Sequence, residues 1–179
     1  MCCLTFEGIQ DILSLPSACE WVKSGPLASF FTTTEVGSVG VVPGFIERVS
    51  ALVGVTRSIA NIMGLTAIIS PCLRAIESLK HAYQAISGAS SGPGSMWIWP
   101  MSLSQDFLNL INDNDPAALI ILSHFVVLVH PFEKSLWFLH GWSSGVIAAV
   151  DCAIDTAWKG WIEWPILCVR EATDIIGKE

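Results

Sequence analysis

The sequence predicts an all-α protein, a single-domain helical bundle that encloses an apolar pocket. Apolar residues recur at helical spacing over residues 72–86, and an unbroken apolar run extends over residues 116–129. No segment shows a strong alternating strand pattern, although residues 35–42 could pass for a strand. The composition is 52% hydrophobic and only 14% charged, so the chain is expected to bury most of itself.

In the N-terminal third, the pattern predicts a short helix near Phe6 to Leu13. A loop rich in Gly and Thr follows, and a helix from about Phe45 to Met63 comes after it.

The middle of the chain predicts two helices separated by a loop. Ser70 and Pro71 supply an N-cap and a first-turn proline for the helix over residues 72–86. Residues 87–95 are a Gly/Ser/Pro run, and we expect a flexible loop within one domain that covers residues 1–179. Ser102 and Gln105 have the spacing of a capping box ahead of the next helix.

The second half begins with a strong helix signal. Asp115 and Pro116 predict a cap and a first-turn proline, and Pro131 predicts that the apolar helix stops near His130. Apolar residues at helical spacing predict a further helix over residues 146–161. Trp164 and Pro165 then open the last helix.

Charge and cysteine spacing exclude several classes of site. The net charge of −7 argues against nucleic-acid binding, which needs clustered Lys and Arg. The six cysteines form no Cys-x-x-Cys pair, so neither a zinc site nor a disulfide framework is expected. Reduced thiols fit a cytoplasmic protein. We expect no metal and no cofactor.

A stable membrane insertion is not expected either. The apolar run over residues 116–129 is shorter than the roughly 18 residues of a spanning helix, and it contains His124. The N-terminal residues, with Glu7 and Asp11 and no basic start, do not read as a signal peptide. A homodimer stays open as a further partner.

Several motifs in the second half resemble the carboxy-terminal region of fungal Zn2Cys6 transcription factors of the sterol uptake control type. They cover roughly residues 71 to 170 and occur in the order found in that family: an upstream segment at 73–79, a Trp-Pro pair at 99–100, an apolar tract at 116–130, a Trp-rich turn at 137–142 and a Trp-x-x-Trp-Pro element at 161–165.

The resemblance implies an all-helical module with a hydrophobic pocket, which in the sterol regulators binds a sterol. The zinc cluster and basic linker of that family are missing from this sequence. The resemblance therefore implies a lipid-like pocket and does not imply transcription.

His124 is the sharpest candidate for chemistry. It lies in a helix that is apolar all round, so its imidazole must find a polar partner inside the protein. One interpretation is a core histidine bonded to a backbone carbonyl. The other is a catalytic donor or proton carrier facing a ligand.

Tyr83 is the second catalytic candidate, because its hydroxyl, on the apolar face of its helix, needs a buried acceptor. The eight tryptophans are large core fillers taken singly, but as a set they suit the walls of a pocket for a flat polycyclic ligand. The residues expected to bind such a ligand are Trp97, Trp99, Phe107, Leu128, His130, Trp137 and Trp142.

Carboxylates are weaker candidates. Asp151 and Asp155 are four residues apart on a helix, where a solvated face is favoured over an acid/base pair. Glu133, close to His130, could act as an acid at a helix end.

Together these features predict a protein that binds a hydrophobic terpenoid or sterol-like molecule. One hypothesis is a cofactor-free cyclase or isomerase of fungal secondary metabolism, of the Diels-Alder type. In it the pocket orients a polyene, and His124 or Tyr83 donates a hydrogen bond. The alternative is a ligand-sensing protein, similar to a transcription regulator, that lacks the DNA-binding domain.

Overall fold

The structure, a computed structural model, describes residues 42–88, 93–134 and 136–174, and these residues are mostly helical, with no strand among them. This confirms the predicted all-α fold. The helix expected near Phe6 to Leu13 lies outside the described residues, and so does the strand alternative at 35–42 except for its last residue.

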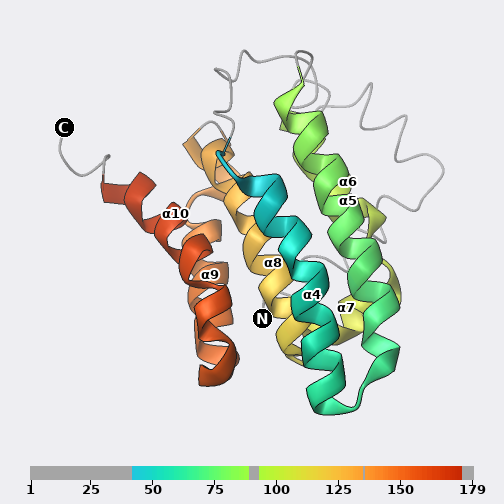
Figure 1. The fold of residues 1–179 in the computed structure, drawn as a ribbon. Helices are drawn as coiled ribbons and strands as arrows, with labels where there is room; N and C mark the ends of the chain where they lie inside the picture. Colours follow the sequence, from blue (N-terminus) through green and yellow to red (C-terminus); the bar gives the residue numbers. More distant parts are fainter. Residues whose placement is uncertain (1–41, 89–92, 135, 175–179) are drawn as a thin grey trace.

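Helices α4 (Phe45–Met63) and α5 (Ile69–Ser87) form an antiparallel hairpin along one side of the bundle (Figure 1). Gly64 ends α4 in a left-handed conformation with φ of 68°, and the turn η1 (Thr66–Ile68) leads into α5. Pro71 lies in the first turn of α5, as predicted. The cap predicted at Ser70 was wrong, because η1 leads into α5 and Ser70 already lies within the helix.

Two short helices follow the end of α5. α5 extends to Ser87, and the turn η2 (Pro93–Trp97) comes next among the described residues, so both ends of the loop expected at 87–95 are helical. Residues 89–92 of that loop lie outside the described part. Helices α6 (Ile98–Ser102) and α7 (Gln105–Asn112) then pack against α5.

The capping box predicted from Ser102 and Gln105 was wrong. Ser104 caps α7 by accepting a hydrogen bond from the backbone N–H of Phe107 at 3.4 Å. Ser102 instead ends α6, and its hydroxyl donates to the carbonyl of Trp99.

Helix α8 (Pro116–Val129) is the centre of the bundle, with α4 and α5 on one side and α9 and α10 on the other (Figure 1). As predicted, Asp115 caps it, accepting from the N–H groups of Ala117 and Ala118 at 2.9 and 3.3 Å. All its residues from Ala117 to Val129 are buried.

The segment Pro116–Lys134 is long and apolar enough to cross a membrane, judged by length and composition alone, and 83% of its most apolar window is buried inside the protein. Burial on this scale is what a core helix shows, so the segment is weak support for a membrane span.

The chain continues through the short turns η3 (His130–Lys134) and η4 (Trp137–Leu139) into α9 (Trp142–Ala153), η5 (Thr156–Trp161) and α10 (Glu163–Asp174). The start of α10 agrees with the prediction from Trp164 and Pro165.

The single helix predicted over residues 146–161 was wrong. Helix α9 ends at Ala153, because Ile154 and Asp155 adopt extended backbone and the Asp155 carboxylate caps η5 through the N–H of Ala157 at 3.0 Å. Asp151, expected on the same face, pairs with Lys159 at 2.9 Å.

Candidate functional site

His124 lies in the middle of α8 with only 3% of its surface exposed. Its Nδ1 is 2.9 Å from the carbonyl oxygen of Ile120. Because a carbonyl only accepts, Nδ1 must carry the proton, and Nε2 is left as an acceptor. Burial lowers the pKa of His124 from 6.5 to about 4, so the ring is neutral at pH 7. These are the contacts of a core histidine bonded to the backbone.

Tyr83 is half-buried, and its hydroxyl donates to the carbonyl of Val42 at 3.3 Å. Its ring stacks on Phe45 at 4.7 Å, Phe45 lies 6.2 Å from Trp164, and Trp164 lies 5.5 Å from His124. The two predicted catalytic residues therefore lie at opposite ends of one chain of rings, separated by Phe45 and Trp164.

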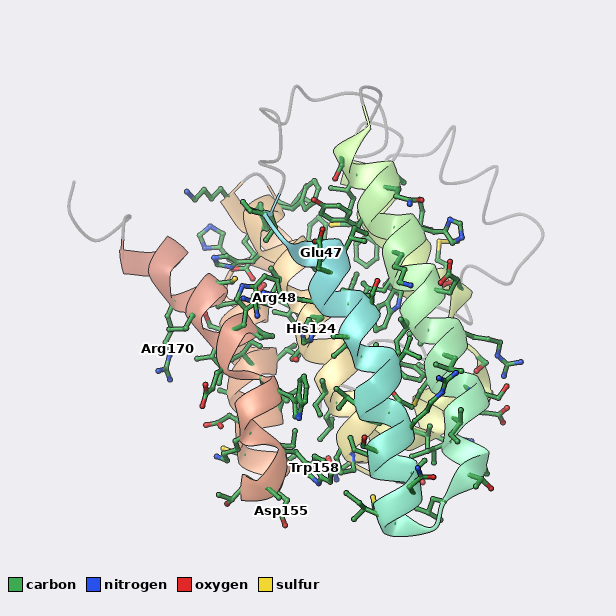
Figure 2. The ribbon with its side chains drawn as sticks, viewed as in Figure 1. Glu47, Arg48, His124, Asp155, Trp158 and Arg170 are labelled. Atoms are coloured by element: carbon green, nitrogen blue, oxygen red, sulfur yellow. The ribbon has the colours of Figure 1, made fainter. Side chains whose placement is uncertain are left out.

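Arg48 joins this chain from α4. Its guanidinium lies over the Trp164 ring at 4.7 Å from the centroid, and Figure 2 shows Arg48 and His124 between α4 and α10. Its positive charge adds to the lowering of the His124 pKa, although burial is the larger cause.

A second set of rings contains three of the residues predicted to bind a ligand. Trp99 stacks on Phe125 at 4.3 Å, and Phe107 and Trp142 meet these two rings edge-on at 6.0 and 6.2 Å. We call Phe107, Trp99, Phe125 and Trp142 the aromatic ladder. Trp99 is fully buried, and its indole N–H donates to the carbonyl of Ala75 at 2.8 Å. Trp142 is half-buried and forms the outer end.

The remaining predicted ligand-binding residues lie apart. Leu128 is buried in α8, and Trp97 is half-buried beside the exposed ring of Phe138 at 6.5 Å. Trp137 begins η4, and its side chain lies outside the described part of the structure.

His130 belongs to a polar cluster at the start of α9, which we call the α9 cluster: His130, Glu133 and Ser143. The Glu133 carboxylate accepts from the N–H groups of Ser143 and Gly141 at 2.6 and 3.3 Å, and so caps α9. His130 Nδ1 lies 3.8 Å from Glu133 Oε2, which is too far for a hydrogen bond.

Two polar atoms of the α9 cluster are buried and have no hydrogen-bond partner among the described residues. They are Nδ1 of His130 and Oγ of Ser143, and the Ser143 side chain is fully buried. Each unsatisfied buried group costs about 1–3 kcal/mol, so two beside one carboxylate require a physical explanation.

Sequence reasoning singled out His130 and mentioned Glu133, but it missed Ser143. A signal was present, because residues 141–145 read Gly-Trp-Ser-Ser-Gly and fit the Gly-x-Ser-x-Gly pattern. A nucleophile elbow needs a strand before the serine, whereas here η4 comes before it and Ser143 lies in the first turn of α9. The pattern therefore marks a tight helix start at Gly141, which has φ of 74°.

Two further buried groups have shifted pKa values. Burial raises the pKa of the Cys72 thiol to about 12, so this thiol stays protonated and unreactive. Burial also raises the pKa of Asp115, against the two backbone hydrogen bonds that lower it. In the part of the chain that the structure describes, no group of three or more His, Cys, Asp or Glu side chains could hold a metal ion.

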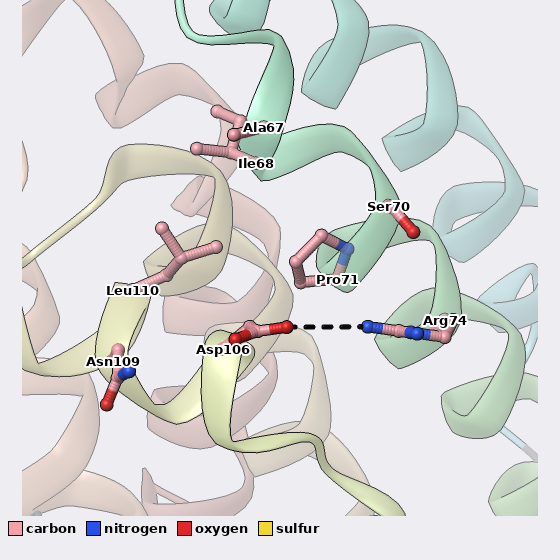
Figure 3. A pocket seen from close by; sticks show the side chains of 8 residues that line it. All are labelled: Ala67, Ile68, Ser70, Pro71, Arg74, Asp106, Asn109 and Leu110. Carbon is pink, nitrogen blue, oxygen red and sulfur yellow. Dashed lines mark ion pairs between the residues drawn. The ribbon is translucent and has the colours of Figure 1, made fainter.

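A surface groove of about 430 Å³ lies elsewhere, between the start of α5 and α7 (Figure 3). None of the residues predicted to bind a ligand lines it.

No protein-family model matches the chain, and comparisons with curated proteins and with solved structures found no match. The resemblance to the sterol-type regulators therefore stays a prediction that rests on its own residues.

Proposed function

We propose that this protein binds a hydrophobic small molecule that bears a hydroxyl group, as a terpenoid or sterol does. The observation that carries the proposal is the pair of unsatisfied atoms in the α9 cluster, His130 Nδ1 and Ser143 Oγ. A hydroxyl group has one donor and two acceptor positions, so it can donate to the imidazole and accept from the serine at once.

The apolar part of the ligand would lie beside the aromatic ladder. Trp142 and Ser143 are consecutive residues in the first turn of α9, so the same turn carries the outer end of the ladder and one of the two polar atoms. Flat ring faces next to a small number of placed polar groups are the usual composition of a small-molecule site. The ladder is closely packed, so the ligand would displace the half-buried Trp142 ring as it enters.

Binding of this kind suits a sensor better than a catalyst. Both predicted donors are engaged with backbone carbonyls, His124 with Ile120 and Tyr83 with Val42. Neither is a free hydrogen-bond donor toward a ligand carbonyl. Displacement of Trp142 would shift the start of α9, which gives binding a structural consequence that a partner protein can detect.

The cofactor-free cyclase or isomerase is the second candidate. The Tyr83 hydroxyl bond is long at 3.3 Å, compared with a usual O–H···O distance of about 2.7–2.8 Å. The phenol could therefore exchange Val42 for a substrate carbonyl at low cost.

Native mass spectrometry after incubation with a lipid extract tests binding, and chromatography of the released ligand tests conversion. We expect retention of a hydroxylated hydrophobic molecule that is recovered unchanged. Recovery of a cyclised or isomerised product would favour the enzyme. Failure to retain any hydrophobic molecule would contradict both candidates.

A further inference from the structure

The groove of Figure 3 is a second candidate site, separate from the aromatic ladder and the α9 cluster. Its volume of about 430 Å³ falls in the range of about 300–1,000 Å³ typical of small-molecule sites. It is an open groove at the surface, so a ligand can enter without any helix moving.

The groove combines an apolar floor with a charged edge. Ile68 and Pro71 are buried and Leu110 is half-buried, and together they present an apolar surface. Arg74 from α5 and Asp106 from α7 meet across the groove at 3.8 Å, as Figure 3 shows.

The bond between Arg74 and Asp106 is weak, because their side chains are 63% and 73% exposed and water screens the pair. A guanidinium has five N–H donors and a carboxylate has about four acceptor positions, so each can take a second partner. A simple anion would be attracted by Arg74 and repelled by Asp106, and the reverse holds for a simple cation.

We propose that the groove binds a small zwitterion with an apolar tail, the chemistry of a free aliphatic α-amino acid. Its carboxylate pairs with Arg74 and its ammonium with Asp106, so all four charges are compensated. The tail lies on Ile68, Pro71 and Leu110.

Titration with L-leucine, followed by backbone amide shifts in NMR, tests the proposal. We expect saturable shifts near Ile68, Ser70 and Leu110. Two analogues of leucine are matched controls: 4-methylpentanoate lacks the ammonium and 3-methylbutylamine lacks the carboxylate. Each should bind at least about fivefold more weakly, because it loses one of the two ion pairs with the groove and its remaining charge is repelled by the like-charged side chain.

Arg74→Gln and Asp106→Asn should weaken leucine binding to a similar extent, whereas Arg57→Gln, an exposed change on α4, should leave it unchanged. The unperturbed part of each spectrum reports that the variant is folded. Equal affinity for leucine and either analogue, shifts confined to other surfaces, or no saturable shift would each overturn the proposal.

Discussion

The contacts of His124 explain its state of protonation. Its Nδ1 proton is held by the Ile120 carbonyl, and burial keeps the ring neutral. The sequence could predict that this imidazole is buried, because its helix is apolar on every face. The partner could not be predicted, because it depends on the side-chain rotamer and not on the spacing of residues.

His124 should make the stability of the protein depend on pH. The pKa of His124 is about 4 in the folded state and 6.5 in the unfolded state. At a pH between these two values, the imidazole is therefore protonated in the unfolded state and neutral in the folded state. Its contribution is therefore complete above pH 6.5 and is lost as the pH falls toward 4, by up to roughly 3 kcal/mol.

Urea unfolding at pH 7 and pH 4.5, on the protein and on His124→Leu, measures this contribution. The variant lacks the titrating ring, so it should lose less free energy of unfolding over this interval. The same loss in both proteins would show that His124 is not the group responsible.

The Glu133 carboxylate should contribute more to the free energy of unfolding than an ordinary surface acid does. Glu133→Ala leaves the N–H groups of Ser143 and Gly141 without their acceptor, so we expect a loss of about 1–3 kcal/mol. Glu163→Ala is the control, an exposed acid in the first turn of α10, and should cost about 0.5 kcal/mol or less. Equal losses in chemical denaturation would argue against the cap.

At the scale of elements, the best predictions came from residues whose effect is local. Asp115 and Pro116 marked the start of α8, because a carboxylate cap and a fixed proline φ act on the next turn alone. The break after Ala153 was missed because apolar residues keep helical spacing through it, while the Asp155 cap that interrupts the helix was interpreted as surface charge.

The two aspartate caps give a matched test. Asp115→Ala should cost about 0.5–2 kcal/mol, since it removes two hydrogen bonds at the start of the central helix. Asp155→Ala removes one bond from the short, exposed turn η5 and should cost less. Thermal unfolding of both variants measures the difference. A larger loss of stability for Asp155→Ala than for Asp115→Ala would contradict the claim that α8 is the centre of the bundle.

At the scale of the whole molecule, the sequence could predict the fold class but not where the candidate sites form. Burial of α8 follows from its composition. The meeting of His130, Glu133 and Ser143 depends instead on how η3 turns back toward α9. The groove beside α7 depends likewise on how α7 packs against α5. No local sequence pattern predicts that packing.

The central claim is that a hydroxyl group on a hydrophobic ligand satisfies the α9 cluster. Titration of tryptophan fluorescence with cholestanol and with cholestane tests it most directly, because the two differ only in that hydroxyl. We expect cholestanol to bind at least about tenfold more tightly, corresponding to roughly 1.4 kcal/mol. Ser143→Ala should remove this preference, and Ser144→Ala, on the exposed side of the same turn, should keep it. Equal affinity for the two ligands, or a preference that survives Ser143→Ala, would contradict the account.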